Sequence, residues 1–194
     1  MKKGKLCLVP AGSKKKPRFT IVVSGDINEE LYNYVLTRVG EYLNEKQYYS
    51  GITVLITSGG GVAYIAMAIY DILKTLNADI WTVAVGECAS AATIIFALGN
   101  KRFVSENLNF LVHTSRIELE SLVTMREVKY LTESLESVNE KIMKILGNLI
   151  DNENFEKRLQ DDFASVKEDF ISIEDLLNYG VATDKLEDFA SVLY

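Results

Sequence analysis

Two apolar segments, each leading through a glycine-containing turn into a helical pattern, constrain the fold of this chain most strongly. The apolar residues 52–56 precede Thr57-Ser58-Gly59-Gly60-Gly61, and a helical pattern begins at Val62. The apolar residues 80–85 precede Gly86-Glu87-Cys88-Ala89-Ser90, and another helical pattern follows. Glycines between a strand and a helix let backbone N–H groups approach a ligand oxygen without interference from Cβ atoms. Because small residues flank Ser90, we expect its hydroxyl to be accessible.

Strand and helix patterns alternate along the first part of the sequence. Residues 19–24 predict a strand, and Asp26 with Glu29 three positions later has the spacing of a capping box. Further helices are expected over residues 62–76 and after Ser90, with a short strand over residues 109–113. Strands separated by helices indicate right-handed crossovers and a mostly parallel sheet. The first expected helix carries apolar residues on one face: Leu31, Val35, Val39 and Leu43.

His113 ends the last of these strands and is the single histidine of the chain. Parallel sheets bind ligands at the carboxyl ends of their strands, so we expect His113 and both glycine turns on one side of the sheet. Histidine titrates near neutral pH and activates a serine hydroxyl that lies within hydrogen-bond reach. Taken singly, a histidine after a strand is more often a packed or surface residue, and a serine at a helix start is usually an N-cap.

One long helix is expected between residues 120 and 150. Its length of roughly 45 Å exceeds what the sheet of so small a domain can cover, so we expect part of it to protrude and pack against another subunit. A shorter helix over 154–162, a loop over 163–171 and a final helix capped by Ser172 and closed by Gly180 should follow. The apolar residues of the long helix repeat with the spacing of a heptad seam: Val128, Leu131, Leu135, Val138, Ile142, Ile145 and Leu149.

Composition favours one globular domain. The 194 residues are 48% hydrophobic with two prolines, which predicts a single domain over residues 18–194. Six lysines near the amino terminus predict a basic arm over residues 1–17. A net charge of −6 argues against a nucleic-acid partner, and no apolar run is long enough to span a membrane. Cys7 and Cys88 lack metal-binding or CxxC spacing, and no signal peptide pattern precedes them, so we expect a cytoplasmic protein without a metal or cofactor.

Several of these segments resemble the proteolytic subunit of the Clp protease, a family of serine peptidases with a crotonase-like fold. The resemblance runs from about Arg18 to Asp184, and residues 61–90 align without a gap. It implies an α/β fold with βαβ units and a protruding handle made of the long helix and a strand. The motifs that carry it are residues 59–71, the turn ending at Ser90, Lys101-Arg102-Phe103, His113 and Tyr179-Gly180.

The resemblance also implies roles for individual residues. Ser90 would be the nucleophile, and His113 the general base that takes its proton and later protonates the leaving amine. The backbone N–H groups of Gly61 and Ala91 would form the oxyanion hole. The family has a proline where Gly59 stands and a methionine at Ala91, and backbone donors survive both changes.

The third member of the triad depends on how the residues are counted. Counting back from Ser172 places the family's aspartate at Ala164, which cannot orient an imidazole. Counting forward through Leu159-Gln160-Asp161-Asp162 gives Asp162, followed by a longer loop than in the family. Without the resemblance, Asp161 and Asp162 would be interpreted as a solvated acidic helix end.

The function expected from the resemblance is a serine endopeptidase that cleaves unfolded polypeptides inside a self-assembled chamber. Two stacked heptameric rings and an AAA+ unfoldase would complete the assembly. The family's Gln-Pro after the histidine and its glycine-rich strand are replaced here by residues 114–120, so substrate preference should differ. Cys88 is expected to be a small buried residue rather than a second nucleophile. Two alternatives remain open: a non-catalytic ring subunit of such an assembly, and a crotonase-like acyl-CoA enzyme.

Overall fold

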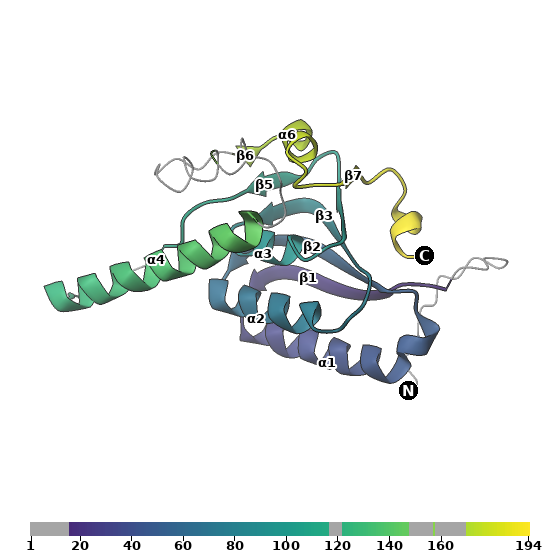
Figure 1. Ribbon diagram of the computed structural model, residues 1–194, viewed down its shortest axis with the longest axis horizontal. Helices are drawn as coiled ribbons and strands as arrows, with labels where there is room; N and C mark the ends of the chain where they lie inside the picture. The colour runs from purple at the N-terminus through teal and green to yellow at the C-terminus, as the bar shows by residue number, and fades with distance from the viewer. Residues whose placement is uncertain (1–15, 117–121, 148–156, 158–169) are drawn as a thin grey trace.

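The computed structural model describes residues 16–116, 122–147, 157 and 170–194, which form a mostly parallel sheet of seven strands with helices packed against it (Figure 1). The alternation of strands and helices confirms the predicted βαβ units. The strands are β1 (Phe19–Ile27), β2 (Ile52–Gly61), β3 (Ile80–Ala89), β4 (Lys101–Val104), β5 (Asn109–Leu111), β6 (Phe170–Ile171) and β7 (Asp184–Lys185). The helices are α1 (Glu29–Glu45), α2 (Ala63–Lys74), α3 (Ala92–Phe96), α4 (Met125–Gly147) and α6 (Ile173–Asn178), with short 3-10 turns η1 (Lys46–Tyr48) and η2 (Phe189–Val192).

The sheet divides at β3, and this division places the predicted histidine beside the predicted serine. The strand order is β1-β2-β3-β4-β7, and β5 pairs with β3 and with β6. The first half of β3 pairs with β4, whereas residues 87–89 pair with β5. The carboxyl end of β5 therefore lies next to the carboxyl end of β3. Only the short β5–β6 pair is antiparallel; β6 occupies the last two residues of the segment that was predicted as a loop.

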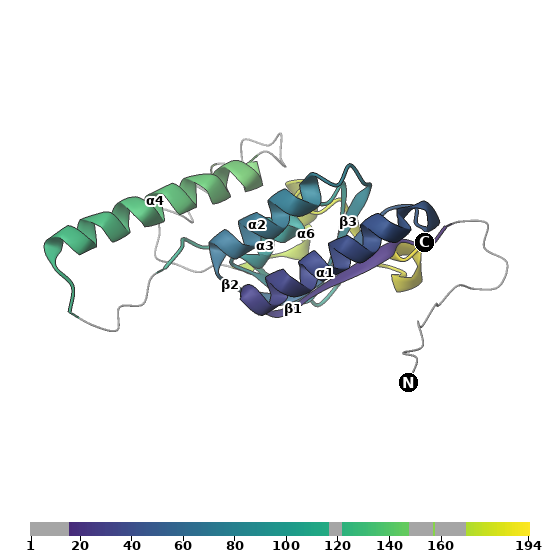
Figure 2. The same cartoon turned by 90° about the horizontal axis from the view of Figure 1, so that it is seen from below.

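Helices α1 and α2 lie side by side over one face of the sheet (Figures 1 and 2). Buried and exposed side chains alternate along β1: Ile21 and Val23 are fully buried, while Val22 between them is exposed. This alternation explains why the helices pack on one face. Side chains of the three parallel strands β1, β2 and β3 pack under the helices as one continuous core. The sheet and its helices therefore form the rigid body from which the strand ends project.

The buried face of helix α1 differs from the prediction in the last turn of the helix. Leu31, Val35 and Val39 are buried as expected, but Leu43 is 49% exposed and Tyr42 is buried in its place. The ring of Tyr42 packs against that of Phe19 on β1, with their centroids 5.5 Å apart. This aromatic contact sets the last turn of the helix face.

The start of α1 also corrects a prediction. Asn28, not Asp26, is the N-cap, because Asn28 Oδ1 accepts a hydrogen bond of 3.0 Å from the Leu31 N–H. Asp26 belongs instead to β1, which runs three residues past its predicted end after an irregularity at Gly25. The final helix agrees with expectation: Ser172 Oγ accepts from the Asp175 N–H at 3.1 Å.

The glycine segment is the end of β2 rather than a separate turn. Asp26 pairs with Gly60, and Ile27 pairs with Gly61. Both glycines have positive φ, 106° at Gly60 and 140° at Gly61. A Cβ on Gly60 would lie 2.7 Å from Ser90 Cβ, and one on Gly61 would lie 2.5 Å from the Ile27 carbonyl oxygen. Both positions therefore require glycine for β2 to lie between its neighbours.

At the opposite end of the sheet, Arg18 ties the beginning of the domain to its end. Its guanidinium donates to Thr53 Oγ1 at 3.0 Å and to the Asp79 carbonyl at 2.6 Å, and it stacks over the Trp81 ring at 3.9 Å. Thr53 in turn donates to the carbonyl of Val192 in η2. This buried cluster fixes the amino ends of the strands, far along the sheet from the glycine segment.

Helix α4 extends away from the sheet, as predicted (Figures 1 and 2). Near its end Ile142 and Leu146 are buried, whereas Met125 at its start is 83% exposed and Val128 is 38% exposed. Leu149 and, apart from residue 157, the helix predicted over 154–162 lie outside the described residues. Across the described ranges, no helix combines the length and apolar character needed to cross a membrane.

The close packing of Gly60 against Ser90 predicts an asymmetry between neighbouring glycines. Gly60→Ala should lower the free energy of unfolding by about 2 kcal/mol or more, because its Cβ meets backbone and its φ suits only glycine. Gly59→Ala is the matched control, since its Cβ would meet only the flexible Glu87 carboxylate at 3.3 Å. Urea unfolding of both variants measures the difference. Equal losses of stability would contradict this packing.

Candidate active site

Ser90 lies at the junction of β3 and α3 with a left-handed backbone, φ 54°. This conformation is uncommon outside glycine and persists only where the surroundings hold it. The Ser90 N–H donates to the Leu111 carbonyl at 2.9 Å. The Ser90 carbonyl accepts from the Thr93 N–H at 3.1 Å and from the Thr93 hydroxyl at 2.7 Å. The backbone of Ser90 is therefore fixed on both sides, while its side chain remains partly exposed.

Gly61 and Ala91, the predicted oxyanion-hole residues, come from the two segments that meet at Ser90. Gly61 ends β2, and Ala91 precedes α3. The Ala91 nitrogen lies 3.0 Å from the place that a Cβ on Gly60 would take, which shows how closely the segments approach. The first N–H groups of a helix have no acceptor within the helix. The Ala91 N–H, at the start of α3, therefore has no acceptor within that helix. The N–H of Val62, the residue after Gly61, differs because it donates to the Ile27 carbonyl.

His113 follows β5 and is partly buried. Its Nδ1–H donates to the carbonyl of Thr114, the next residue, at 2.6 Å. With a proton on Nδ1, the neutral ring keeps Nε2 as an acceptor. Among the described residues, His113 makes its hydrogen bond to this carbonyl and not to Ser90. Hydrogen bonds of catalytic groups are often loose before substrate binds, so the pair remains compatible with proton transfer.

A cavity of about 810 Å³ brings these residues together. As expected from the strand order, Ser90 and His113 lie on its wall with Gly61 and Ala91, at the carboxyl ends of the strands. Four parts of the chain form the remaining walls: residues 26–28, the start of α2, the segment after β5 up to Arg116, and the inner part of α4. The cavity is large enough for several amino-acid side chains.

Sequence reasoning missed several residues of this cavity. Leu135, Val138 and Ile142 of α4 line it, although the heptad pattern assigned them only to a packing seam. Thr93 holds the Ser90 carbonyl, and its position three residues after Ser90 was the available signal. Asp26 lines the cavity too, because β1 extends past its predicted end.

Cys88 precedes Ser90 by two residues and is fully buried. Burial raises the pKa of its thiol well above the usual range, and the charge of Glu87 raises it further. The thiol therefore stays protonated near neutral pH, and a protonated, enclosed thiol is a poor nucleophile. Cys88 is a packed residue, as its sequence context predicted.

The third predicted triad member lies outside the described residues. Asp162, Asp161, the alternative position Ala164 and also Cys7 all belong to the segments without a described placement. Within the described ranges, no three His, Cys, Asp or Glu side chains gather where they would hold a metal ion.

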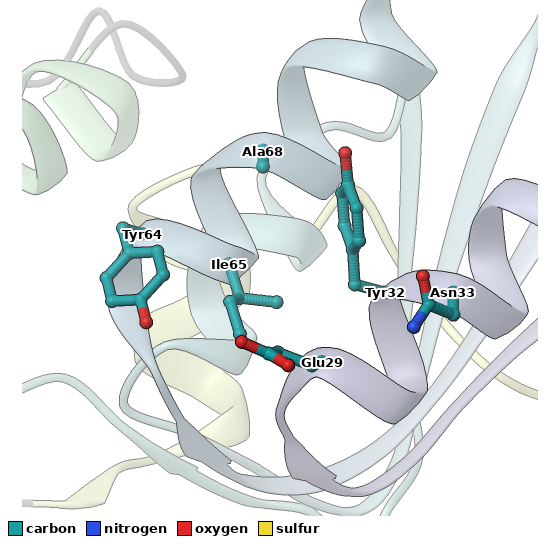
Figure 3. Close-up of a pocket in the computed structure, with 6 residues that line it drawn as sticks. All are labelled: Glu29, Tyr32, Asn33, Tyr64, Ile65 and Ala68. Atoms are coloured by element: carbon teal, nitrogen blue, oxygen red, sulfur yellow. The ribbon is translucent and has the colours of Figure 1, made fainter.

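A second hollow of about 360 Å³ lies between α1 and α2 (Figure 3). Tyr32 and Tyr64 stand on either side of Ile65, and the Glu29 side chain lies below it. Tyr64 also lines the cavity of Ser90, so the two hollows are neighbours. The lining residues of this second hollow include no serine, cysteine or histidine, which leaves the larger cavity as the candidate active site.

Known proteins resemble this chain over most of its length. A family profile described as Clp protease matches residues 14–187. The chain is 32% identical over 95 residues to the ATP-dependent Clp protease proteolytic subunit of Ligilactobacillus salivarius (strain UCC118), covering 48% of each protein. It is 29% identical over 129 residues to the ATP-dependent Clp protease proteolytic subunit 2 of Treponema denticola, covering 66% of this chain and 63% of the relative.

The matched region thus spans about half of the first curated relative and less than two thirds of the second. Among solved structures, a ClpP1 mutant from Listeria monocytogenes has the same fold, with a TM-score of 0.69 and 24% identity over 90% of this chain and 94% of that one. Because the family profile covers nearly the whole domain, from residue 14 to residue 187, this protein belongs to the Clp protease family.

Proposed function

We propose that this protein is a serine endopeptidase that hydrolyses peptide bonds of unfolded polypeptides. One observation supports this function above others: Ser90 and His113 line the same cavity, and Ser90 is held in a strained left-handed conformation at a strand-to-helix junction. Such strain is found most often where a side chain must be presented to a ligand. Membership of the Clp protease family supports the same activity.

The proposed mechanism uses two residues and two backbone donors. His113 Nε2 takes the proton of Ser90 Oγ as that oxygen attacks the substrate carbonyl. The N–H groups of Gly61 and Ala91 stabilise the negative oxygen of the tetrahedral intermediate. His113 then passes the proton to the leaving amine, and water hydrolyses the acyl-serine with the same histidine as base.

Orientation of His113 is the step in which Asp162 is proposed to act. In the structure the Thr114 carbonyl holds the Nδ1–H and therefore the same tautomer that an aspartate would hold. A carboxylate would also stabilise the imidazolium that forms during the reaction, which a neutral carbonyl does less well. We propose that Asp162 replaces or joins the Thr114 carbonyl in the catalytic state.

We propose that the exposed seam of α4 is the contact through which subunits assemble into stacked rings. Val128 and Leu131 lie on the part of α4 that extends beyond the sheet, and Val128 is 38% exposed in the single chain. A heptad seam without a packing partner is unfavourable on a protein surface in water. A partner α4 from another subunit would cover it, and two heptameric rings joined in this way would enclose the active sites in a chamber.

Delivery of substrate by an AAA+ unfoldase and a cytoplasmic location complete the proposal. Membership of the Clp protease family supports both parts of the proposal. A ring subunit without catalytic activity is the competing interpretation, because His113 hydrogen-bonds to the Thr114 carbonyl rather than to Ser90 among the described residues. Labelling of Ser90 separates the two.

A fluorophosphonate probe should label the parent protein at Ser90, because the reagent reports an activated serine. Ser90→Ala should lose both labelling and peptide cleavage, the latter by at least about 10³-fold. Cys88→Ala should retain both, since the thiol is buried and protonated. Mass spectrometry locates the label. An unlabelled, inactive parent would favour the non-catalytic subunit, and activity that disappears in Cys88→Ala would indicate the thiol as nucleophile.

Asp162→Asn should lower turnover by orders of magnitude. Loss of an orienting aspartate from a related triad costs about 10⁴-fold. Asp161→Asn removes the same charge one position away and should be far milder. Steady-state cleavage of a fluorogenic peptide by both variants measures the difference. Unchanged turnover in Asp162→Asn would show that the Thr114 carbonyl alone orients His113.

The assembly prediction is tested best on the outer half of α4, because Leu135 and Ile142 also line the cavity. Val128→Glu combined with Leu131→Glu should release smaller species, since buried like charges oppose helix pairing. Ser137→Glu, at an exposed position on the opposite side of the same helix, is the control. Sedimentation velocity at micromolar concentration gives the oligomeric state. A monomeric parent protein would disprove the proposed interface.

A further inference from the structure

A carboxylate that makes no ion pair or hydrogen bond among the described residues lies at the end of β1, beside the candidate active site. Asp26 lines the cavity of Ser90 and also an adjoining hollow of about 480 Å³. The pairing of β1 is irregular at Gly25, which has φ 75°, and Asp26 follows this irregularity as the strand's second-last residue. Within the described residues, the Asp26 side chain makes no ion pair or hydrogen bond, and Asn28 rather than Asp26 caps α1.

The strand order places Asp26 on one side of Ser90 and His113 on the other. At the carboxyl edge, Ile27 of β1 pairs with Gly61 of β2, and β3 ends between β2 and β5. The edge therefore runs from Asp26 through Gly61 and Ser90 to His113.

This order assigns a direction to a bound peptide. His113 must protonate the leaving amine, so the leaving side of the substrate lies toward β5. The acyl side then extends away from His113, past Gly61 and toward the end of β1. Asp26 is the carboxylate that lines the cavity on this side.

The charges of the cavity support the same direction. Arg116, the cation among its lining residues, comes from the segment after β5, whereas Asp26 comes from β1 at the other end of this edge. Neither arginine nor lysine lines the adjoining hollow, where Asp26 is joined by Glu30. A positive charge on the acyl side of a substrate would meet Asp26, and a negative charge there would be repelled.

We propose that Asp26 is a specificity-determining residue, which favours a lysine or arginine side chain two to four positions to the acyl side of the scissile bond. This inference rests on the proposed peptidase function and deepens it. Asp26 forms an ion pair with the substrate and takes no part in the proton transfers. Because Asp26 is exposed, the preference is moderate and decreases at high salt.

The test uses matched peptides in which one position carries either lysine or norleucine, on the acyl side or on the leaving side. In the parent, kcat/KM for acyl-side lysine should exceed that for norleucine by about fivefold, the size expected of a partly exposed ion pair. Asp26→Asn should bring this ratio close to one, and Asp26→Lys should invert it. Asp71→Asn is the control, because it removes the same charge from an exposed position of α2 and should leave the ratio unchanged.

Three results would overturn the inference: a ratio unchanged in Asp26→Asn, an equal fall in Asp71→Asn, or an equal effect of lysine on the leaving side. The second would show that only the net charge of the protein attracts the peptide. Equilibrium binding of the lysine and norleucine peptides to Ser90→Ala, with and without Asp26→Asn, gives the ratio without turnover. A parent that cleaves no peptide would disprove the proposed function, while this binding ratio would still decide the role of Asp26.

Discussion

The close approach of β2 to the end of β3 is the constraint on which the candidate site depends. A side chain at Gly60 would overlap Ser90 Cβ, the Ala89 carbonyl oxygen and the Ala91 nitrogen. Because Gly60 has none, the ends of the two strands come within contact distance, and Gly61 and Ala91 lie on the wall of one cavity. Two N–H donors from separate segments act on one oxygen only if their backbones are held at such close range. The hydrogen bonds on both sides of Ser90 then fix the position of the serine beside these two donors.

The sequence predicts the fold well where a pattern has one physical cause. Apolar strands separated by amphipathic helices have few packing solutions other than a parallel sheet, and that sheet is observed. The ends of elements were harder to predict, because they depend on contacts distant in sequence. Pairing with β1 extends β2 through its glycines, and the contact with Phe19 selects Tyr42 over Leu43. Neither the pairing with β1 nor the contact with Phe19 can be deduced from the local spacing of apolar residues.

The candidate site was predictable where backbone geometry determines it and less so where long segments meet. Ser90, Gly61 and His113 lie at the carboxyl ends of strands that share one edge, so their grouping could be expected from strand order. The contribution of α4 to the cavity could not be expected in this way. The periodicity of Leu135 and Val138 indicates that one face of the helix is covered, but it does not indicate what covers that face. Thr114 likewise bonds to His113 through its carbonyl, which is independent of side-chain identity.

The two departures from the family pattern beside Ser90 affect the walls of the site more than its backbone. An added side chain at Gly59 would meet only the end of the Glu87 side chain, and Ala91 has ordinary helical φ and ψ. Neither position sets the direction of an N–H donor, since that direction follows from the conformations of Gly60 and Gly61 and from the hydrogen bonds to Ser90. The proposed machinery for polarising a carbonyl is thus separable from the cavity surfaces that would contact a substrate. Those surfaces come from α4, from the segment after β5 and from the end of β1.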